Sequence, residues 1–220
     1  MKRYYIKTII FVLAALLTFS FTACGSKTST ASQTAVSSAS VTNVNKKTAT
    51  DVNISYPVTG NTAADKIIKA EATAGAKALG YSVSQKDLTL EVKYKIYHPS
   101  ADVISVMYYG NAYIQGNAYP VDFSYAVTVN KKTGKKVPLS TYVTSSDKIV
   151  KAINASGYKV ISGGLQEEGP DMILQYYNTY AQSQLSSHYY DYYVTEKNIY
   201  IIISGLGYDM GDYSVIRFSR

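Results

Sequence analysis

A strict alternation of apolar and polar side chains between residues 88 and 97 restricts the fold of this chain more than any other feature. A period of two places successive side chains on opposite faces of a β-strand, whereas a helix repeats about every 3.6 residues. The sequence therefore predicts a half-buried strand here. The positions expected to face the core are Leu88, Leu90, Val92, Tyr94 and Ile96, and they alternate with Thr89, Glu91, Lys93, Lys95 and Tyr97.

Further strands and turns follow this one at short intervals. The His-Pro-Ser sequence at 98–100 predicts a turn, and residues 103–109 predict a strand that ends at the Gly-Asn pair after it. The Lys-Lys-Thr-Gly sequence at 131–134 predicts a second turn, because these are turn residues and lysines protect exposed edges. The other predicted strands are 52–56, 121–130, 189–194, 199–204 and 213–218.

Helices are predicted between these strands. Residues 62–80 begin with Thr-Ala-Ala-Asp, which suits a reciprocal amino-terminal cap, and end at Gly80. Ser-Asp at 146–147 and Pro-Asp at 170–171 predict the starts of two more helices. Strands in runs, with helices segregated between them, indicate an α+β fold with a mainly antiparallel sheet and two to three helices packed on it.

The amino end has the composition of an export signal. Lys2, Arg3 and Lys7 precede an apolar run over 8–21, which is shorter than the roughly 20 residues that span a bilayer. The run ends at Phe-Thr-Ala-Cys, a sequence that resembles the lipobox of bacterial lipoproteins, in which the cysteine is diacylated. Cys24 is the only cysteine, so no disulfide can form within the chain. We therefore expect a lipoprotein on the outer face of the cytoplasmic membrane, anchored through palmitate-type acyl chains on Cys24.

Composition divides the chain into three parts. Residues 1–23 are the predicted signal peptide, and residues 24–50, rich in Ser, Thr and Ala, are predicted to be a disordered tether. Residues 51–220 have the length of a single α+β domain. The net charge is +7, of which three charges leave with the signal, so +4 remains. A nucleic-acid-binding protein would carry a denser basic stripe, and we expect no nucleic-acid partner.

Tyrosine is unusually abundant, with 23 Tyr against 5 Phe and no Trp. Its apolar ring and polar tip suit half-buried strand positions as well as contact surfaces. The doublets at 108–109, 189–190 and 192–193 lie on predicted strands, where consecutive side chains point to opposite faces. One ring of each doublet should therefore be exposed unless a helix covers the outer face. The candidate ligand-binding residues are Tyr109, Tyr113, Tyr119, His188, Tyr190 and Tyr192.

The chain between residues 56 and 218 resembles a known family in the order of its elements and in three segments. Residues 116–120 are similar to that family's Gly-x-Ala-His-Pro segment, 132–140 to its Thr-Gly-Lys turn, and 193–219 to its terminal strands. The family is the extracytoplasmic pair of domains of unknown function, DUF4163 and DUF3298, found in the lysozyme-sensing anti-sigma factor of Gram-positive bacteria and ahead of certain peptidoglycan deacetylase domains. Tyr119 stands where the family has histidine, so no role of that histidine carries over. The resemblance implies a module that binds an extracellular protein or cell-wall material.

Patterns that indicate catalysis are sparse. His98 and His188 are the only histidines and have no metal-ligand spacing, so we expect no metal and no cofactor. His98 is interpreted as a turn residue. No Gly-x-Ser-x-Gly elbow occurs, and we assign no catalytic residue.

The residue patterns leave two functions from different classes. The first is a non-catalytic binding lipoprotein of the cell envelope, which recognises an extracellular protein or a peptidoglycan glycan through tyrosine-rich loops. The alternative is a cell-wall-modifying hydrolase that uses carboxylates with Tyr119 or His188. Two pairs of carboxylates are available to such an enzyme, Glu167 with Glu168 and Asp209 with Asp212.

Overall fold

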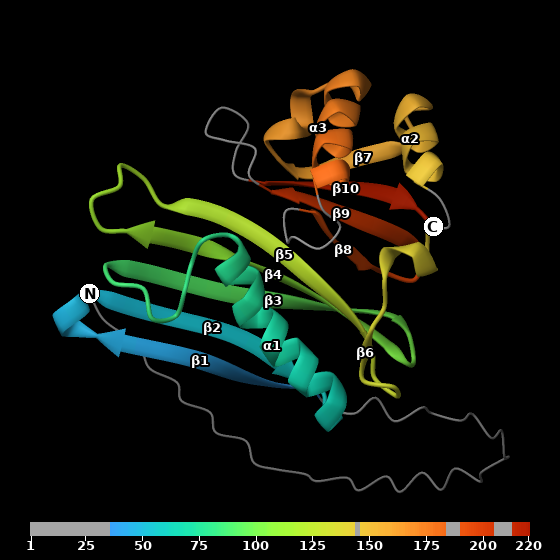
Figure 1. Cartoon of the computed structure of the whole chain (residues 1–220). Coiled ribbons are helices and arrows are strands. Elements are labelled where there is room, and N and C mark those ends of the chain that lie inside the picture. The colour runs from blue at the N-terminus through green and yellow to red at the C-terminus, as the bar shows by residue number, and fades with distance from the viewer. Residues whose placement is uncertain (1–35, 144–145, 184–189, 205–212) are drawn as a thin grey trace, which may run out of the picture. The chain divides into compact units, whose positions relative to one another are not determined.

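The computed structural model describes residues 36–143, 146–183, 190–204 and 213–220, which form two β-sheets with helices packed on them (Figure 1). The first sheet has the strand order β1-β2-β3-β4-β5-β6, and the second has the order β7-β10-β9-β8. Every described strand pairing is antiparallel except that of β2 with β3. The predicted α+β class with a mainly antiparallel sheet is confirmed.

The strands of the first sheet are β1 (Ser37–Asn45), β2 (Thr50–Val58), β3 (Leu88–Ser100), β4 (Val103–Ile114), β5 (Val121–Asn130) and β6 (Lys135–Lys136). Those of the second sheet are β7 (Tyr158–Gly163), β8 (Tyr190–Val194), β9 (Asn198–Ser204) and β10 (Tyr213–Ser219). The α-helices are α1 (Thr62–Ala78), α2 (Ser146–Asn154) and α3 (Pro170–Ser183), and short 3-10 turns cover Lys46–Thr48, Leu139–Thr141 and Gly164–Glu167.

The N-cap of helix α1 lies one residue earlier than the sequence predicts. Asn61 is the N-cap, and its side-chain oxygen accepts a hydrogen bond from the Ala64 backbone N–H at 3.0 Å. Asp65 accepts bonds from the backbone N–H groups of Thr59, at 2.7 Å, and Gly60, at 3.1 Å. An Asn rather than a Thr therefore provides the cap, and Asp65 bonds the two residues ahead of the cap rather than the cap's own N–H, so the predicted reciprocal cap is wrong in its partners.

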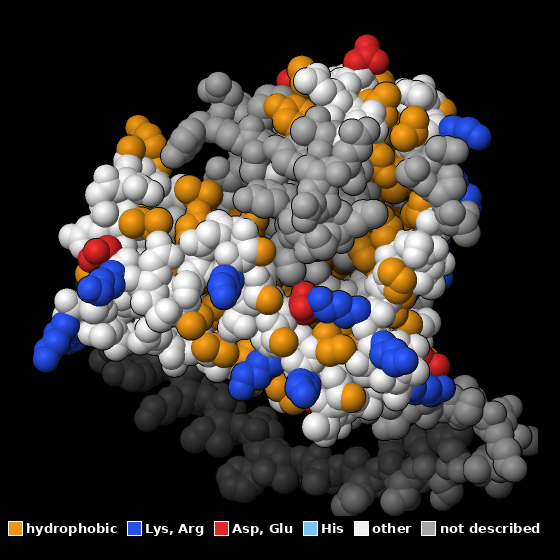
Figure 2. Space-filling model, in the orientation of Figure 1, with side chains coloured by type: hydrophobic (Ala, Val, Ile, Leu, Met, Phe, Trp, Pro, Cys, Tyr) orange, Lys and Arg blue, Asp and Glu red, His pale blue; other side chains and the backbone are white. Residues whose placement is uncertain are grey.

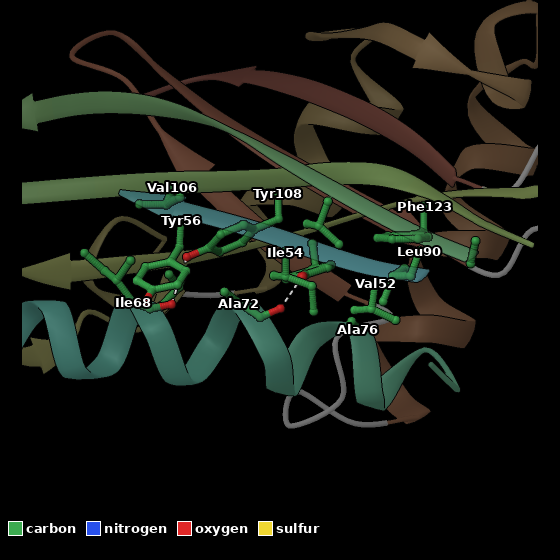
Figure 3. Close-up of a cluster of buried hydrophobic side chains, with 14 of the residues drawn as sticks. Val52, Ile54, Tyr56, Ile68, Ala72, Ala76, Leu90, Val106, Tyr108 and Phe123 are labelled. Carbon is green, nitrogen blue, oxygen red and sulfur yellow. Dashed lines mark hydrogen bonds between the residues drawn. The ribbon is translucent and has the colours of Figure 1, made fainter. Parts of the chain in front are cut away.

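The first core lies between α1 and one face of the first sheet (Figure 3). The helix contributes residues four apart, Ala64, Ile68, Ala72 and Ala76, because that spacing places side chains on one helix face. The sheet contributes Leu88, Leu90 and Val92, so the predicted core-facing side of the alternation is confirmed at these positions.

The second sheet also has two covered faces. On one face, α2 and α3 enclose a core that includes Ile153, Ile173 and Ile201. On the other face, Tyr193, Ile202 and Val215 pack with Met107 and Ala126 of the first sheet. The side chains between the two sheets therefore form a third, smaller core.

Hydrogen bonds between side chains and backbone groups also join the two sheets. Strand β6 pairs only with the end of β5, at Val129 and Asn130. Other backbone N–H and C=O groups along this edge of β5 are therefore left for the second sheet. The carboxylate of Asp191 accepts from the Ala126 N–H at 3.0 Å, and the Ser204 hydroxyl donates to the Ser124 carbonyl at 3.0 Å. Side chains thus satisfy backbone groups that a further strand would otherwise pair with.

The predicted start of the folded part, at residue 51, is too late. Strand β1 lies inside the predicted tether and pairs with β2 along its whole length, from Ser37 opposite Val58 to Asn45 opposite Thr50. Its side chains are mostly small and polar, and of its apolar residues only Ala39 and Val41 pack against the first core. Backbone pairing does not depend on side-chain size, which is why composition alone missed this strand.

Two other local predictions need correction, and one strand was missed. Strand β3 continues through His98 to Ser100, so the turn comes after Ser100 rather than at 98–100. Gly110 lies inside β4, where a Cβ would overlap the carbonyl oxygen of Glu91, so the glycine permits a close approach of β3 instead of ending the strand. Strand β7 was not predicted; it is a short edge strand whose Ile161 is exposed.

Candidate binding surface

The second sheet covers only part of the first-sheet face that lies opposite α1. At the covered end, Tyr97, Met107 and Tyr109 pack against the second sheet. Beyond that end the same face is solvent-accessible and polar. Its cross-strand rows run Thr42, Asn53, Glu91, Asn111, Asp122 and Val44, Asp51, Thr89, Tyr113. We call the side chains of these two rows, together with the neighbouring Lys93 and Lys95, the open face.

The alternation in β3 explains why this face is polar. Its even-numbered residues point into the core under α1, so the odd-numbered Glu91, Lys93 and Lys95 point to the open face. Lys93 pairs with Glu91 at 3.1 Å. Lys95 lies with its Nζ 5.3 Å from the centre of the Tyr109 ring, within the range of a cation–π contact.

Strand β4 places two tyrosines on this side of the sheet. These are Tyr109 and Tyr113, with Asn111 between them, and they alternate with residues that face the core. A rise of about 3.3 Å per residue separates the two tyrosines by about 13 Å. Tyr109 is half-buried at the border of the second sheet, and Tyr113 is 36% exposed. Tyr119 is 68% exposed in the segment between β4 and β5. An aromatic, an amide and a second aromatic thus follow one another along a single rigid strand.

A stack of tyrosines fills the space between the sheets beside the open face. The ring of Tyr193 lies 4.6 Å from that of Tyr97 and 4.5 Å from that of Tyr200, and both pairs are nearly parallel. Burial raises the pKa of Tyr193 well above its usual value, and the neighbouring tyrosines raise it further. Burial also raises the pKa of Tyr213, an effect strengthened by the nearby carboxylate of Asp122. These hydroxyls are therefore protonated at neutral pH and act as neutral hydrogen-bonding groups.

The structure separates Tyr192 from Tyr109, Tyr113 and Tyr119. Tyr192 packs into the core under α2 and α3, where its hydroxyl donates to the Val137 carbonyl and its ring lies 6.2 Å from that of Tyr142. Burial raises its pKa. Tyr190 lies on β8 opposite Ile203, and both His188 and Cys24 lie outside the described residues.

In the two described tyrosine doublets, a helix covers one ring and the partner sheet contacts the other, a form of cover that the sequence analysis did not anticipate. Tyr108 is fully buried under α1 and donates to the Ile68 carbonyl at 2.9 Å, while Tyr109 turns toward the second sheet. Tyr193 likewise packs between the sheets. A helix layer covers one face of each sheet and the partner sheet covers part of the other, so a doublet does not require an exposed ring.

A depression that sequence reasoning missed lies at the other end of β3. It measures about 410 Å³ and is open to solvent, and its walls are the end of β3 and the turn between β8 and β9. Burial, and to a lesser degree Lys131, lowers the pKa of His98 in this wall. No local signal could reveal it, because its two walls come from segments far apart in the sequence. The lining residues are Ile96, Tyr97, His98, Thr195, Glu196, Lys197 and Asn198.

The lysine-rich segment at 131–134 is a turn, as predicted. The Asn130 side chain accepts from the Lys132 backbone N–H at 2.9 Å, and Gly134 has a positive φ of 61°. Lys132 pairs with Asp102 at 2.9 Å and Lys136 with Glu71 at 2.6 Å. Figure 2 shows the lysine and arginine side chains of this side of the molecule spread over several places.

The residues of the alternative hydrolase are only partly described. Tyr119 and Glu167 are exposed, whereas His188, Asp209 and Asp212 lie outside the described residues. Within the described ranges, no three His, Cys, Asp or Glu side chains gather in a way that could hold a metal ion. In the same ranges, no helix has the length and apolar character needed to cross a membrane.

Comparison with known proteins gives similarity to solved structures alone. No family model matches the chain, and no curated protein matches it. A DUF3298 family protein from Pseudomonas aeruginosa is 9% identical, with a TM-score of 0.47, over 84% of this chain and 88% of that chain. A DUF3298 family member from Bacteroides fragilis is 12% identical, with a TM-score of 0.38, over 86% of this chain and 91% of that chain. Identities and scores of this size carry no conclusion about family or function.

Proposed function

We propose that this chain is a non-catalytic binding protein of the cell envelope, displayed on the outer face of the cytoplasmic membrane by a lipid on Cys24. Its ligand is an extracellular protein or a cell-wall glycan, and the open face with Tyr113 is the contact surface. The observation that carries the proposal is this polar sheet face, which α1 does not reach and the second sheet leaves accessible.

The chemistry of the open face suits recognition of an extended polar ligand. Tyr113 offers an apolar ring for stacking and a hydroxyl for hydrogen bonding, and Asn111 beside it offers both a donor and an acceptor. Lys93, Lys95 and Asp51 add charges of both signs at the same surface. Because these groups stand on paired strands, they lose little freedom when a ligand binds.

The anchor supports display of this face outside the cell. The charged start, the apolar run and the Phe-Thr-Ala-Cys sequence are the features that motivate it. Radiolabelled palmitate supplied to cells should label the wild-type chain, and Cys24→Ala should remove the label and leave precursor or released protein. A wild-type chain that takes up no label would contradict the lipid anchor without bearing on the open face.

The binding proposal is tested by one matched pair of variants. Tyr113 and Ile161 have nearly equal exposure, 36% and 38%, but Ile161 lies on β7 of the second sheet. Purified wild-type protein is first assayed against peptidoglycan, teichoic acid and secreted muramidases. Tyr113→Ser should then weaken the observed binding by about tenfold, which corresponds to about 1.4 kcal/mol for one lost aromatic contact.

Ile161→Ser should leave the same binding unchanged, and circular dichroism should show both variants folded. Equal loss in the two variants would indicate general destabilisation rather than a contact at the open face. Binding that survives Tyr113→Ser together with Asn111→Ala would place the contact surface elsewhere on the molecule.

A further inference from the structure

Three of the four sheet edges in the described part of the chain are shielded against further pairing. Strand β6 is only two residues long, and both are lysines. Strand β8 lies against β5, where Asp191 bonds the Ala126 N–H. Strand β7 carries Lys159 and a register shift in its pairing with β10. Short length, charge, cover and irregular pairing are the usual means of blocking an edge strand.

Strand β1 has none of these protections. Its nine residues, Ser37–Asn45, contain no charge, no proline and no glycine, and it pairs regularly with β2 from end to end. Within the described ranges no strand pairs with its outer edge. Val44, near its end, is 67% exposed, the largest exposed aliphatic fraction on this sheet. An uncharged, regular edge of this length is a template for one more strand.

We propose that this edge binds the β1 edge of a second copy of the chain, antiparallel, about a twofold axis at Val41. This register pairs all nine residues, with Ser40 opposite Thr42 and Ala39 opposite Asn43 of the second copy. The facing side chains are small or polar and carry no charge, so the strand is compatible with itself. A charged peptide would gain no ion pair from such a strand, which favours a second copy as the occupant.

The position of two lysines decides the direction of pairing. Lys46 and Lys47 follow β1 directly and are exposed. Antiparallel pairing places the lysines of the two copies at opposite ends of the strand pair, about 30 Å apart at about 3.3 Å per residue. Parallel pairing would place them side by side, where like charges repel. The twofold arrangement gives one continuous twelve-stranded sheet, with both α1 helices on one side and both open faces on the other.

Cross-linking of the full chain tests this arrangement. In the proposed register, Thr42 of one copy lies diagonal to Thr42 of the other, about 7–8 Å away. Thr42→Cys should therefore give a dimer with a short bismaleimide linker. Asn53→Cys is the matched control, because Asn53 lies opposite Thr42 on β2 and is also exposed. Three strand spacings, about 14 Å, would separate the two Asn53 positions, beyond the linker.

A charge variant supplies the second measurement. Ser40→Lys with Thr42→Lys sets lysines opposite lysines in the proposed register, and sedimentation should show at least a tenfold weaker dimer, with circular dichroism unchanged. The parent chain, whose only cysteine is Cys24, gives the cross-linking background. Three results would each overturn the proposal. They are cross-linking through Asn53→Cys equal to that through Thr42→Cys, a dimer that is unaffected by the two lysines, and a Thr42→Cys chain that links only to a different protein.

Discussion

Replacing Gly75 with alanine sets helix propensity against packing, and the structure predicts that packing wins. Alanine is favoured over glycine inside a helix by about 1 kcal/mol, so the sequence of α1 taken alone predicts stabilisation. In the folded protein, a Cβ at Gly75 would come within 3.0 Å of three ring carbons of Tyr125. Contacts that close are repulsive, and something must move to relieve them.

The Tyr125 ring has little room to move. It is fully buried, its hydroxyl donates to the Ala72 carbonyl of α1, and it stacks on Tyr108 with ring centres 4.9 Å apart. Overpacking costs about 1–3 kcal/mol, and three overlaps with a ring that has little room to move place this substitution in the upper part of that range, at about 2–3 kcal/mol. The gain in helix propensity offsets about 1 kcal/mol of this cost. We therefore expect Gly75→Ala to lower the free energy of unfolding by about 1–2 kcal/mol, or the Tm by about 2–8 °C.

Thermal and urea denaturation followed by circular dichroism measure this change. Tyr125→Leu is the partner variant, because a smaller side chain opens space for the new methyl group. In a double-mutant cycle, Gly75→Ala should cost less in the Leu background than in the wild type, with a coupling of about 0.5–3 kcal/mol. A Gly75→Ala protein more stable than the wild type would refute the reasoning and show that the helix can shift away from the ring at no cost.

Three further predictions concern buried contacts and strand pairing. Ser105→Ala removes the acceptor of the buried Val194 N–H, at 3.1 Å, and should cost about 1–3 kcal/mol, whereas exposed Ser84→Ala should have no effect in the same urea titration. Burial raises the pKa of Tyr193 above its unfolded value near 10, so the free energy of unfolding should stay constant below about pH 10 and fall as the pH rises further. If the absorbance of all tyrosinates instead rises in one step before the circular dichroism changes, this pH dependence is contradicted. Deleting residues 37–45 should lower the Tm by several degrees because β2 loses one of its two neighbouring strands. An unchanged Tm would show that β1 contributes nothing to stability, as predicted for a tether.

Local patterns were sufficient where one segment carries its own signal. The alternation from Leu88 to Ile96 identifies β3 and its buried side, since a strand's two faces repeat every second residue whatever it pairs with. The Asn-Lys-Lys-Thr-Gly turn and the Pro170 helix start were also visible, because turn and capping chemistry is confined to a few neighbouring residues.

Tertiary structure decided what depends on a partner distant in the sequence. The sequence by itself determined the α+β class and the order of most elements. It ended the second strand at Tyr109, and only the structure extends β4 to Ile114, which places Tyr113 on the strand. Only the fold showed that β1 belongs to the sheet, that Tyr192 faces the helices, and where the second sheet ends on the first. Backbone pairing and face-to-face packing join segments whose side chains give no local sign of each other, so the accessible part of a sheet face is a property of the assembled layers.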